Sequence, residues 1–166
     1  MKTIFDEATR EELIRRIQSL EKSHPAQWGK MNVYQMAKHC TIWDEWVLGV
    51  HKPKYKQGFL GLIFGKMVLK ASVKDDRPIK KNAPAGRAFI VKEQDGDLEL
   101  QKKIWISRIA AYKNFSNPDF IHDFFGKMTR DEIGIFAYKH SDHHLRQFGA
   151  VDRAENSSRK TTAANP

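Results

Sequence analysis

The sequence predicts an all-α protein, and three observations support this fold class. The chain has 166 residues, which fits one domain of ordinary size. Apolar residues recur at helical spacing along several stretches. Two of these stretches begin with an Asn or Thr followed three residues later by a Gln or Glu, the pattern of a helix capping box. We therefore expect a helical bundle over residues 1–150 and a disordered polar tail over residues 151–166.

The first helix is expected over residues 6–23. Thr9 and Glu12 have the spacing of a capping box, and Pro25 should end the helix. Its inward stripe is formed by four apolar residues at helical spacing, Leu13, Ile14, Ile17 and Leu20.

The second helix should begin at Asn32, because Gln35 lies at the position from which a side chain reaches back to the cap. It should continue to about Val50, before Pro53. A dense apolar stretch follows at residues 58–73, which we interpret as a further short helix that is either buried or covered by a partner. The Lys-, Pro- and Gly-rich residues 73–86 after it should form an extended connector.

Residues 88–112 fit two structures. A hairpin would pair residues 89–91 with residues 98–100. Alternatively, Asp97 caps a helix that continues to Phe115, and the spacing of the apolar residues Leu98, Trp105, Ile109 and Tyr112 favours this helix.

The last helix should begin at Thr129, which forms a capping box with Glu132. It should end near Gly149, since glycine is the preferred residue just after a helix.

The net charge of +9 is concentrated in one segment. Residues 52–92 contain eleven Lys or Arg and two Asp, so this segment accounts for the whole net charge. Such a segment attracts anionic ligands, nucleic acid or a membrane surface, although a solvated connector is the simpler interpretation. Lysine outnumbers arginine and the aromatic residues do not alternate with the charges, so we do not expect a nucleic-acid partner.

The sequence also bounds the compartment. Cys40 is the one cysteine, so no intramolecular disulfide can form, which fits a reducing compartment. The first residues lack the apolar segment of a signal peptide, and no apolar run approaches the ~18 residues of a spanning helix. We expect a cytoplasmic protein without a membrane partner.

Four histidines are the strongest chemical signal. His140, His143 and His144 lie within five residues, and His39 lies in the second predicted helix. On a helical wheel His140 and His144 share the apolar face of the last helix, His143 lies at its edge, and His39 is central on the inward face of its own helix. An i, i+4 pair with one imidazole from a neighbouring helix makes a three-nitrogen metal site with an open position.

A divalent cation shared by His39, His140 and His144 would satisfy three buried rings at once. The alternative is three separately hydrogen-bonded core histidines. Gln147 lies on the same face, where it either orients a ligand or makes a core hydrogen bond. No carboxylate is expected at the site, because Asp142 points away from it, as do two acidic residues of the second helix, Asp44 and Glu45.

The residues beside His39 are given structural roles. Cys40 lies about 100° round the helix and is interpreted as a small core residue. Trp43 and Trp46 are interpreted as core or pocket wall. His24, His51 and His122 lie near predicted helix ends or in loops and receive no role. Trp28-Gly-Lys-Met31 and Phe125-Gly-Lys-Met128 precede the two histidine-bearing helices and indicate two similar helix starts, each with a flexible glycine.

At this point the chain resembles a known family. Trp28-Gly-Lys-Met-Asn-Val-Tyr-Gln-Met-Ala-Lys-His39, Phe125-Gly-Lys-Met-Thr129 and Tyr138-Lys-His-Ser-Asp-His-His-Leu-Arg-Gln-Phe-Gly149 look like the DinB/YfiT-like metalloenzymes. The resemblance covers roughly residues 6–150 and rests on the two histidine-bearing blocks.

The resemblance implies an up-down-down-up four-helix bundle that is often a dimer. It also implies a metal triad that falls on His39, His140 and His144, with zinc or nickel as the metal. His143 would then replace His144, hydrogen-bond a ligand from outside or shuttle a proton. Members of the wider superfamily transfer low-molecular-weight thiols or isomerise thiol adducts.

Three functions are compatible with these features. The first is a metal-dependent transferase acting with a low-molecular-weight thiol, and the second is a metal-dependent hydrolase. The third is a non-catalytic, metal-stabilised bundle that binds an anionic partner through its basic segment. The expected partners are a small-molecule substrate or thiol and a second copy of the chain.

Overall fold

The computed structural model describes residues 1–83 and 86–151, and within these ranges it contains five α-helices and no strand. The helices are α1 (Glu7–Gln18), α2 (Val33–Leu48), α3 (Phe59–Val73), α4 (Leu98–Ala111) and α5 (Arg130–Gln147). Two 3₁₀ helices, Arg87–Phe89 and Tyr112–Asn114, complete the regular structure. The all-α prediction is confirmed. The expected tail lies outside the described residues except for Val151.

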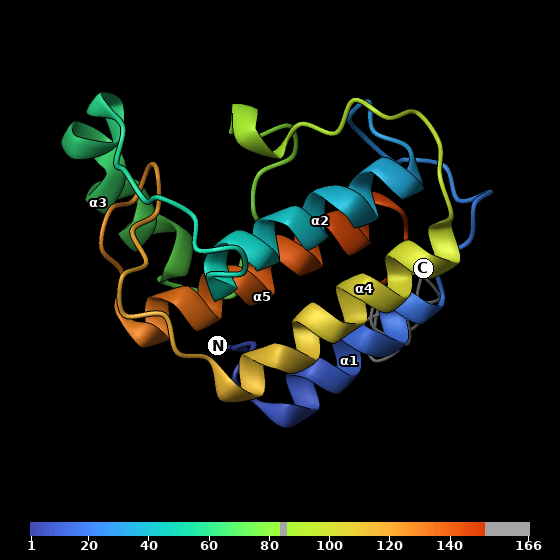
Figure 1. Cartoon of the computed structure of the whole chain (residues 1–166), viewed down its shortest axis with the longest axis horizontal. Coiled ribbons are helices and arrows are strands. Elements are labelled where there is room, and N and C mark those ends of the chain that lie inside the picture. Colours follow the sequence, from blue (N-terminus) through green and yellow to red (C-terminus); the bar gives the residue numbers. More distant parts are fainter. Residues whose placement is uncertain (84–85, 152–166) are drawn as a thin grey trace, which may run out of the picture.

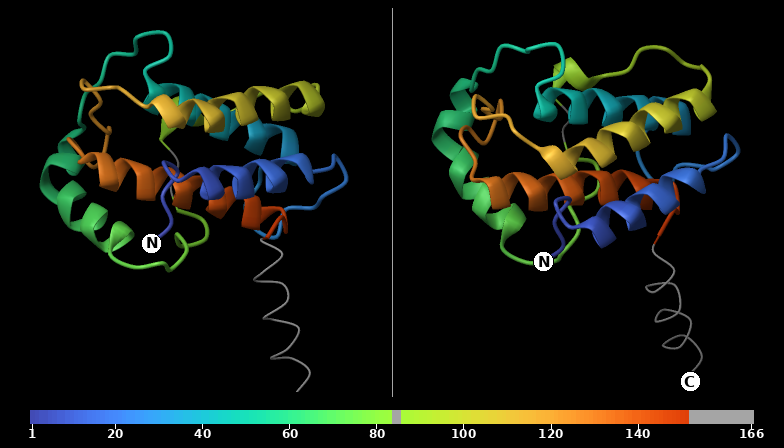
Figure 2. Two further views of the ribbon diagram at one scale, coloured as in Figure 1. Left: turned by 90° about the horizontal axis from the view of Figure 1, so that it is seen from below. Right: turned by 60° about the horizontal axis from the view of Figure 1, so that its bottom comes forward.

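Four helices form a bundle, and α3 lies apart from it. In the bundle α1 packs on α4, α4 on α2, α2 on α5, and α5 on α1, so the contacts close a ring (Figure 1). The fifth helix, α3, contacts α5 at one end of the bundle (Figure 2). The helices that carry the histidines, α2 and α5, are therefore direct neighbours.

The first helix is shorter than predicted, and its predicted capping box does not form. Helix α1 ends at Gln18, well before Pro25, so the proline does not end it. Its N-cap is Asp6, which makes no side-chain cap hydrogen bond. The Glu12 carboxylate cannot reach back to a cap, because it is ion-paired with Lys2 and Arg16.

Both other predicted capping boxes are confirmed. The Asn32 side chain accepts from the Gln35 N–H while the Gln35 side chain accepts from the Asn32 N–H, which starts α2. Thr129 and Glu132 make the same reciprocal pair at the start of α5. Such pairs satisfy backbone N–H groups that a helix leaves without an internal partner. They fix where each histidine-bearing helix begins.

Positive-φ glycines bound these two helices. Gly29 and Gly126, in the two similar tetrapeptides, have φ of 81° and 73°. Gly49 and Gly149 follow α2 and α5 with φ of 76° and 73°. This left-handed region is readily adopted by glycine alone, so the helix ends are fixed by the sequence, as predicted for Gly149.

The ambiguous region around residue 98 is a helix, not a hairpin. The Asp97 side chain accepts from the Leu100 N–H and starts α4, which continues into the second 3₁₀ helix and ends just before Phe115. Trp105, Ile109 and Tyr112 are fully buried against α1 and α2. Tertiary burial of this face therefore favours the helix over the pairing of residues 89–91 with residues 98–100.

The connector after α3 has no helix or strand over residues 74–83 and is attached to α5; it bends at residues 74–76 and turns at residues 81–82, so it is not extended throughout. The Lys139 ammonium donates to the carbonyls of Ser72, Asp75 and Arg77 at 2.5–2.9 Å. Lys139 is only 5% exposed, because the connector covers this side of the helix. A helical wheel of α5 alone cannot show this contact.

Candidate metal centre

Three of the four predicted histidines come together between α2 and α5. One ring nitrogen from each of His39, His140 and His144 lies within 4.8 Å of the other two. His39 Nε2 is 3.2 Å from His140 Nε2. The ring of His39 also lies 4.7 Å from that of His144 between centroids, and the His140 and His144 rings are 4.8 Å apart. His140 and His144 are one turn apart on α5, so both face the same histidine of α2.

The spacing fits a shared cation. Two nitrogen ligands of a tetrahedral site with metal–nitrogen bonds of about 2.0–2.1 Å lie about 3.3 Å apart. The distance between His39 Nε2 and His140 Nε2 is close to this edge. Without a cation, the same contact is a hydrogen bond in which one of the two rings donates. The distance alone therefore does not decide between a metal site and a core histidine cluster.

Hydrogen bonds to the outer nitrogens favour the metal site. His39 Nδ1 donates to the Phe89 carbonyl at 2.8 Å. His144 Nδ1 donates to Gln147 Oε1 at 2.9 Å. Because Nδ1 carries the proton in both rings, each Nε2 presents a lone pair to the centre. Metal-ligating histidines are typically oriented in this way by a carbonyl or carboxylate behind the ring.

The orientation of Gln147 is itself fixed. Its Nε2 donates to the Trp28 carbonyl at 2.7 Å, so its oxygen must face His144. Gln147 is 3% exposed and therefore cannot exchange these partners with water. The wheel placed Gln147 on the histidine face, and the structure brings it into contact with one of the three rings.

Burial keeps the three imidazoles neutral. Desolvation lowers the pKa of His39, lowers that of His140 well below its usual value and lowers that of His144 to about 3. The neighbouring rings act in the same direction on His140 and His144. A neutral imidazole is the form that binds metal, so all three are ready to bind at neutral pH.

His140 has the least support from the protein. Its Nδ1 is buried and has no hydrogen-bond partner among the described residues. Its ring instead stacks on Trp43, with centroids 4.3 Å apart. Trp43 was predicted as core or pocket wall, and it forms the wall behind this ring. Trp46 lies further out, against Phe89 and Phe120.

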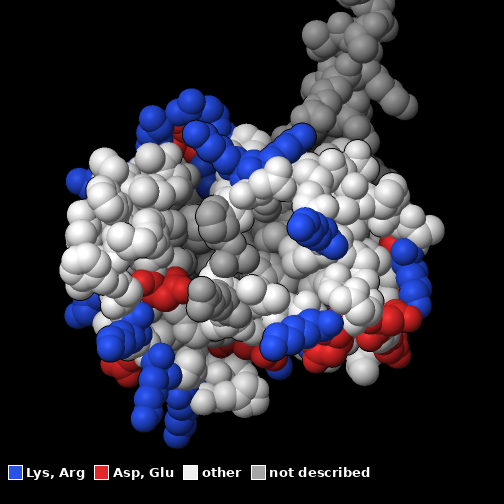
Figure 3. Space-filling model, turned by 90° about the horizontal axis from the view of Figure 1, so that it is seen from above, with Lys and Arg blue, Asp and Glu red and all other residues white. Residues whose placement is uncertain are grey.

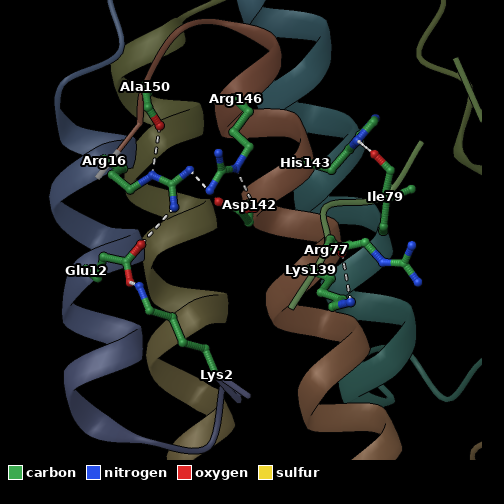
Figure 4. Close-up of polar contacts among 10 residues, drawn as sticks. All are labelled: Lys2, Glu12, Arg16, Arg77, Ile79, Lys139, Asp142, His143, Arg146 and Ala150. Atoms are coloured by element: carbon green, nitrogen blue, oxygen red, sulfur yellow. Dashed lines mark hydrogen bonds and ion pairs between the residues drawn. The ribbon is translucent and has the colours of Figure 1, made fainter. Parts of the chain in front are cut away.

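His143 stays outside the group of three. Its Nδ1 donates to the Ile79 carbonyl of the connector at 3.3 Å (Figure 4). The centroid of its ring lies 5.5 Å from that of Trp28. Its centroid is 5.1 Å from that of His144. Burial lowers the pKa of His143 as well. The structure therefore places His143 beside one member of the triad, where it links α5 to the connector.

The carboxylates near the histidines in sequence are engaged elsewhere. Asp142 accepts from Arg16 and Arg146 on the opposite side of α5, each at 2.7–2.8 Å (Figure 4). Asp44 accepts from Trp105 and Tyr112 inside the bundle, and Glu45 pairs with Arg108. The only group of histidine, cysteine or acidic residues with metal-ligand spacing in the described ranges is the triad itself.

Two contributors were missed from the sequence. The carbonyl of Phe89 holds His39, and the carbonyl of Trp28 holds Gln147. A backbone carbonyl carries no side-chain signal, and Phe89 lies 50 residues from His39 along the chain. Of the histidines without a predicted role, His122 is buried and its Nδ1 accepts from the N–H groups of Phe124 and Phe125, which shapes the turn before α5.

Comparison with known families gives one match. Residues 5–150 match the family described as "Protein of unknown function (DUF1569)". No curated protein and no solved structure matches the chain. The matched range includes all five helices and the three histidines, so the chain belongs to this family.

Proposed function

We propose that this member of the DUF1569 family binds a divalent metal through His39, His140 and His144, and uses it to transfer a low-molecular-weight thiol to an electrophilic substrate. The observation that carries the proposal is the convergence of three neutral imidazoles, two of them with Nδ1 held from behind. Zinc and nickel are the expected metals, since imidazole ligands suit both.

The path of the chain supports a DinB/YfiT-like fold. Along the bundle α1 and α5 run one way while α2 and α4 run the other (Figure 1). This order is up-down-down-up, with α3 and the basic connector inserted between the second and third helices of the bundle. It is the topology that the resemblance of the histidine-bearing blocks implies.

The set of residues at the site favours thiol chemistry. His39, His140 and His144 would hold a divalent cation without neutralising its charge, and a cation so held would lower the pKa of a thiol bound to it, so that no protein base is needed. This suits a site from which Asp44, Glu45 and Asp142 are all directed away. The role left to the protein is positional: Phe89 and Gln147 orient two rings, and Trp43 supports the third.

Hydrolysis is the less well supported alternative. It requires water as the nucleophile and, in addition, an acid that protonates the leaving group. The nearby carboxyl groups are paired away from the histidines, and burial lowers the pKa of each imidazole, so none of them is a ready acid at neutral pH.

Cobalt substitution tests the proposal. The protein is loaded with Co²⁺ and titrated with a small thiol such as 2-mercaptoethanol, and absorption is recorded in the near ultraviolet. We expect a saturable sulfur-to-cobalt charge-transfer band that is absent from His140→Ala. Bound cobalt without a band would show that thiols do not reach the metal, which would exclude the transferase and leave a structural metal site.

A further inference from the structure

Helix α3 is packed with its small face inward. Gly61, Gly65 and Leu69 are its buried residues. A Cβ atom on either glycine would overlap the Phe124 carbonyl, so the helix lies directly on the backbone of the loop before α5. The two glycines allow this close approach, because any side chain there would separate the helix from the loop.

The opposite face is apolar and exposed to solvent. Of the ten large apolar side chains exposed in the described part of the chain, seven are on α3. Phe59 is 74% exposed and Met67 64% exposed. The others are Leu60, Leu62, Ile63, Phe64 and Val68. A contiguous patch of this kind on a single helix marks a surface that is covered by another body.

The place of α3 in the fold leaves this face open. The helix lies across one end of the bundle and forms that end of the molecule (Figure 2). The same end is largely white in the charge view, with Lys and Arg atoms along its borders and a smaller number of Asp or Glu atoms beside them (Figure 3). No described element packs over the seven side chains, since α3 contacts α5 and the loop around Phe124 with its glycine face.

The charges on α3 itself have one sign. Helix α3 carries Lys66 and Lys70, has Lys74 as its C-cap and contains no acidic residue. The segment before it adds three more exposed lysines, Lys52, Lys54 and Lys56. Of the acidic side chains that follow α3, Asp75 pairs with Arg77, and Asp76 lies 4.0 Å from the N-terminal ammonium.

We propose that α3 docks this protein on the surface of a membrane that contains anionic phospholipids. The seven apolar side chains would enter the region between headgroups and acyl chains, while the lysines bind the phosphates above it. The helix would lie in the plane of the surface. At 15 residues it is too short to cross a bilayer, and no helix in the described ranges is long and apolar enough to do so.

Charge decides between this partner and a second copy of the chain. Two copies paired through α3 would bring Lys66, Lys70 and Lys74 of each together, and α3 offers no acidic group to neutralise them. An anionic bilayer covers the apolar face and neutralises the lysines at once. The sequence-based expectation of no membrane partner rested on the lack of a spanning helix and on reading the basic segment as a solvated connector. It could not show that the glycine face of α3 is the buried one.

Sedimentation with vesicles tests the proposal on the full chain. Vesicles of phosphatidylcholine alone are compared with vesicles that also contain phosphatidylserine. We expect binding to the mixed vesicles, weaker binding to phosphatidylcholine, and a loss of binding as salt is raised.

Leu60→Glu combined with Met67→Glu should weaken binding about a hundredfold, because two inserted side chains become charged. The matched control is Ile90→Glu with Leu100→Glu, two exposed apolar residues outside α3, which should bind as wild type.

A second variant keeps the test independent of folding. Lys70→Glu with Lys74→Glu leaves the apolar face unchanged, keeps the contact of Lys66 with the Lys127 carbonyl and should weaken binding to the mixed vesicles about tenfold. Failure of wild type to bind anionic vesicles would overturn the proposal, as would binding that the α3 variants do not change. A dimer in analytical ultracentrifugation that Leu60→Glu with Met67→Glu dissociates, without vesicle binding by wild type, would identify a second copy as the partner. Metal content plays no part in these readouts, so the result is separate from the proposed metal function.

Discussion

Two of the polar side chains that α2 buries, Asp44 and His39, lie on opposite sides of the helix and differ in what surrounds them. Asp44 is fully buried against α4, where its two oxygens accept from Trp105 Nε1 at 3.0 Å and from the Tyr112 hydroxyl at 2.8 Å. His39 is 4% exposed and faces α5. Its Nδ1 donates to the Phe89 carbonyl, and its Nε2 faces the imidazoles of His140 and His144.

The difference shows what distinguishes a binding site from a polar core contact. Burial raises the pKa of Asp44 to about 7 and lowers the pKa of His39, so both groups are perturbed. Asp44 has its hydrogen-bond acceptors satisfied by neighbours, whereas the Nε2 atoms of His39 and His140 face each other at 3.2 Å and His144 is in contact with both rings. The pKa values are shifted on both faces of α2, but only the histidine face has nitrogen atoms that can still bind a ligand.

The largest expected effect is on the Asp44 face. Because burial raises the folded-state pKa of Asp44 from 3.8 to about 7, its contribution to stability is greatest near pH 4 and is lost as pH rises to about 7. This loss is on the order of 4 kcal/mol. Asp44→Asn cannot ionise and still offers an oxygen to Trp105 and an N–H to Tyr112. Urea unfolding from pH 4 to 7.5, with chelator present, should show the decline in wild type relative to the variant, and parallel curves would refute it.

The second largest effect is the stabilisation of the fold by metal bound at the histidine face of α2. Metal at a hundred times its Kd should raise the free energy of unfolding by about 2.7 kcal/mol. Wild type and Asp44→Asn should respond equally, since Asp44 does not touch the histidines. His39→Ala should not respond. Urea unfolding with and without Zn²⁺ measures the shift, and an equal response of His39→Ala would mean that zinc binds elsewhere.

The smallest of these effects sharpens the role of Gln147. Gln147→Leu removes the acceptor behind His144 and should weaken metal affinity about 10- to 100-fold. Gln101→Leu is the matched control, because Gln101 is a similarly buried glutamine that donates to Thr41 and lies outside the histidine group. Competition with a chelating dye measures both affinities. Equal losses of metal affinity in the two variants would show that Gln147 acts only through a hydrogen bond in the core.

The features that arise within a single helix could be predicted from the sequence. The azimuths of His39, His140 and His144 follow from helical periodicity, and the caps at Asn32 and Thr129 follow from local hydrogen bonding. The wheel also directed Asp44 and Asp142 away from the site, where the structure places them.

What could not be predicted depends on contacts between distant segments. The carbonyl of Phe89 behind His39 and the attachment of the connector through Lys139 arise only when segments far apart in sequence meet. The face of α3 that packs inward was hidden for a further reason. Hydrophobic periodicity would bury the large side chains, but two glycines allow the small face to lie on a backbone instead.

The measurement that tests the central claim most directly is metal content by mass spectrometry, on protein purified without a nickel column. Wild type is compared with His39→Ala, His140→Ala, His143→Ala and His144→Ala. We predict about one metal ion per chain in wild type and in His143→Ala, and its loss in the other three variants. Wild type that stays free of metal even after reconstitution with zinc or nickel would contradict the account and leave a cluster of hydrogen-bonded core histidines.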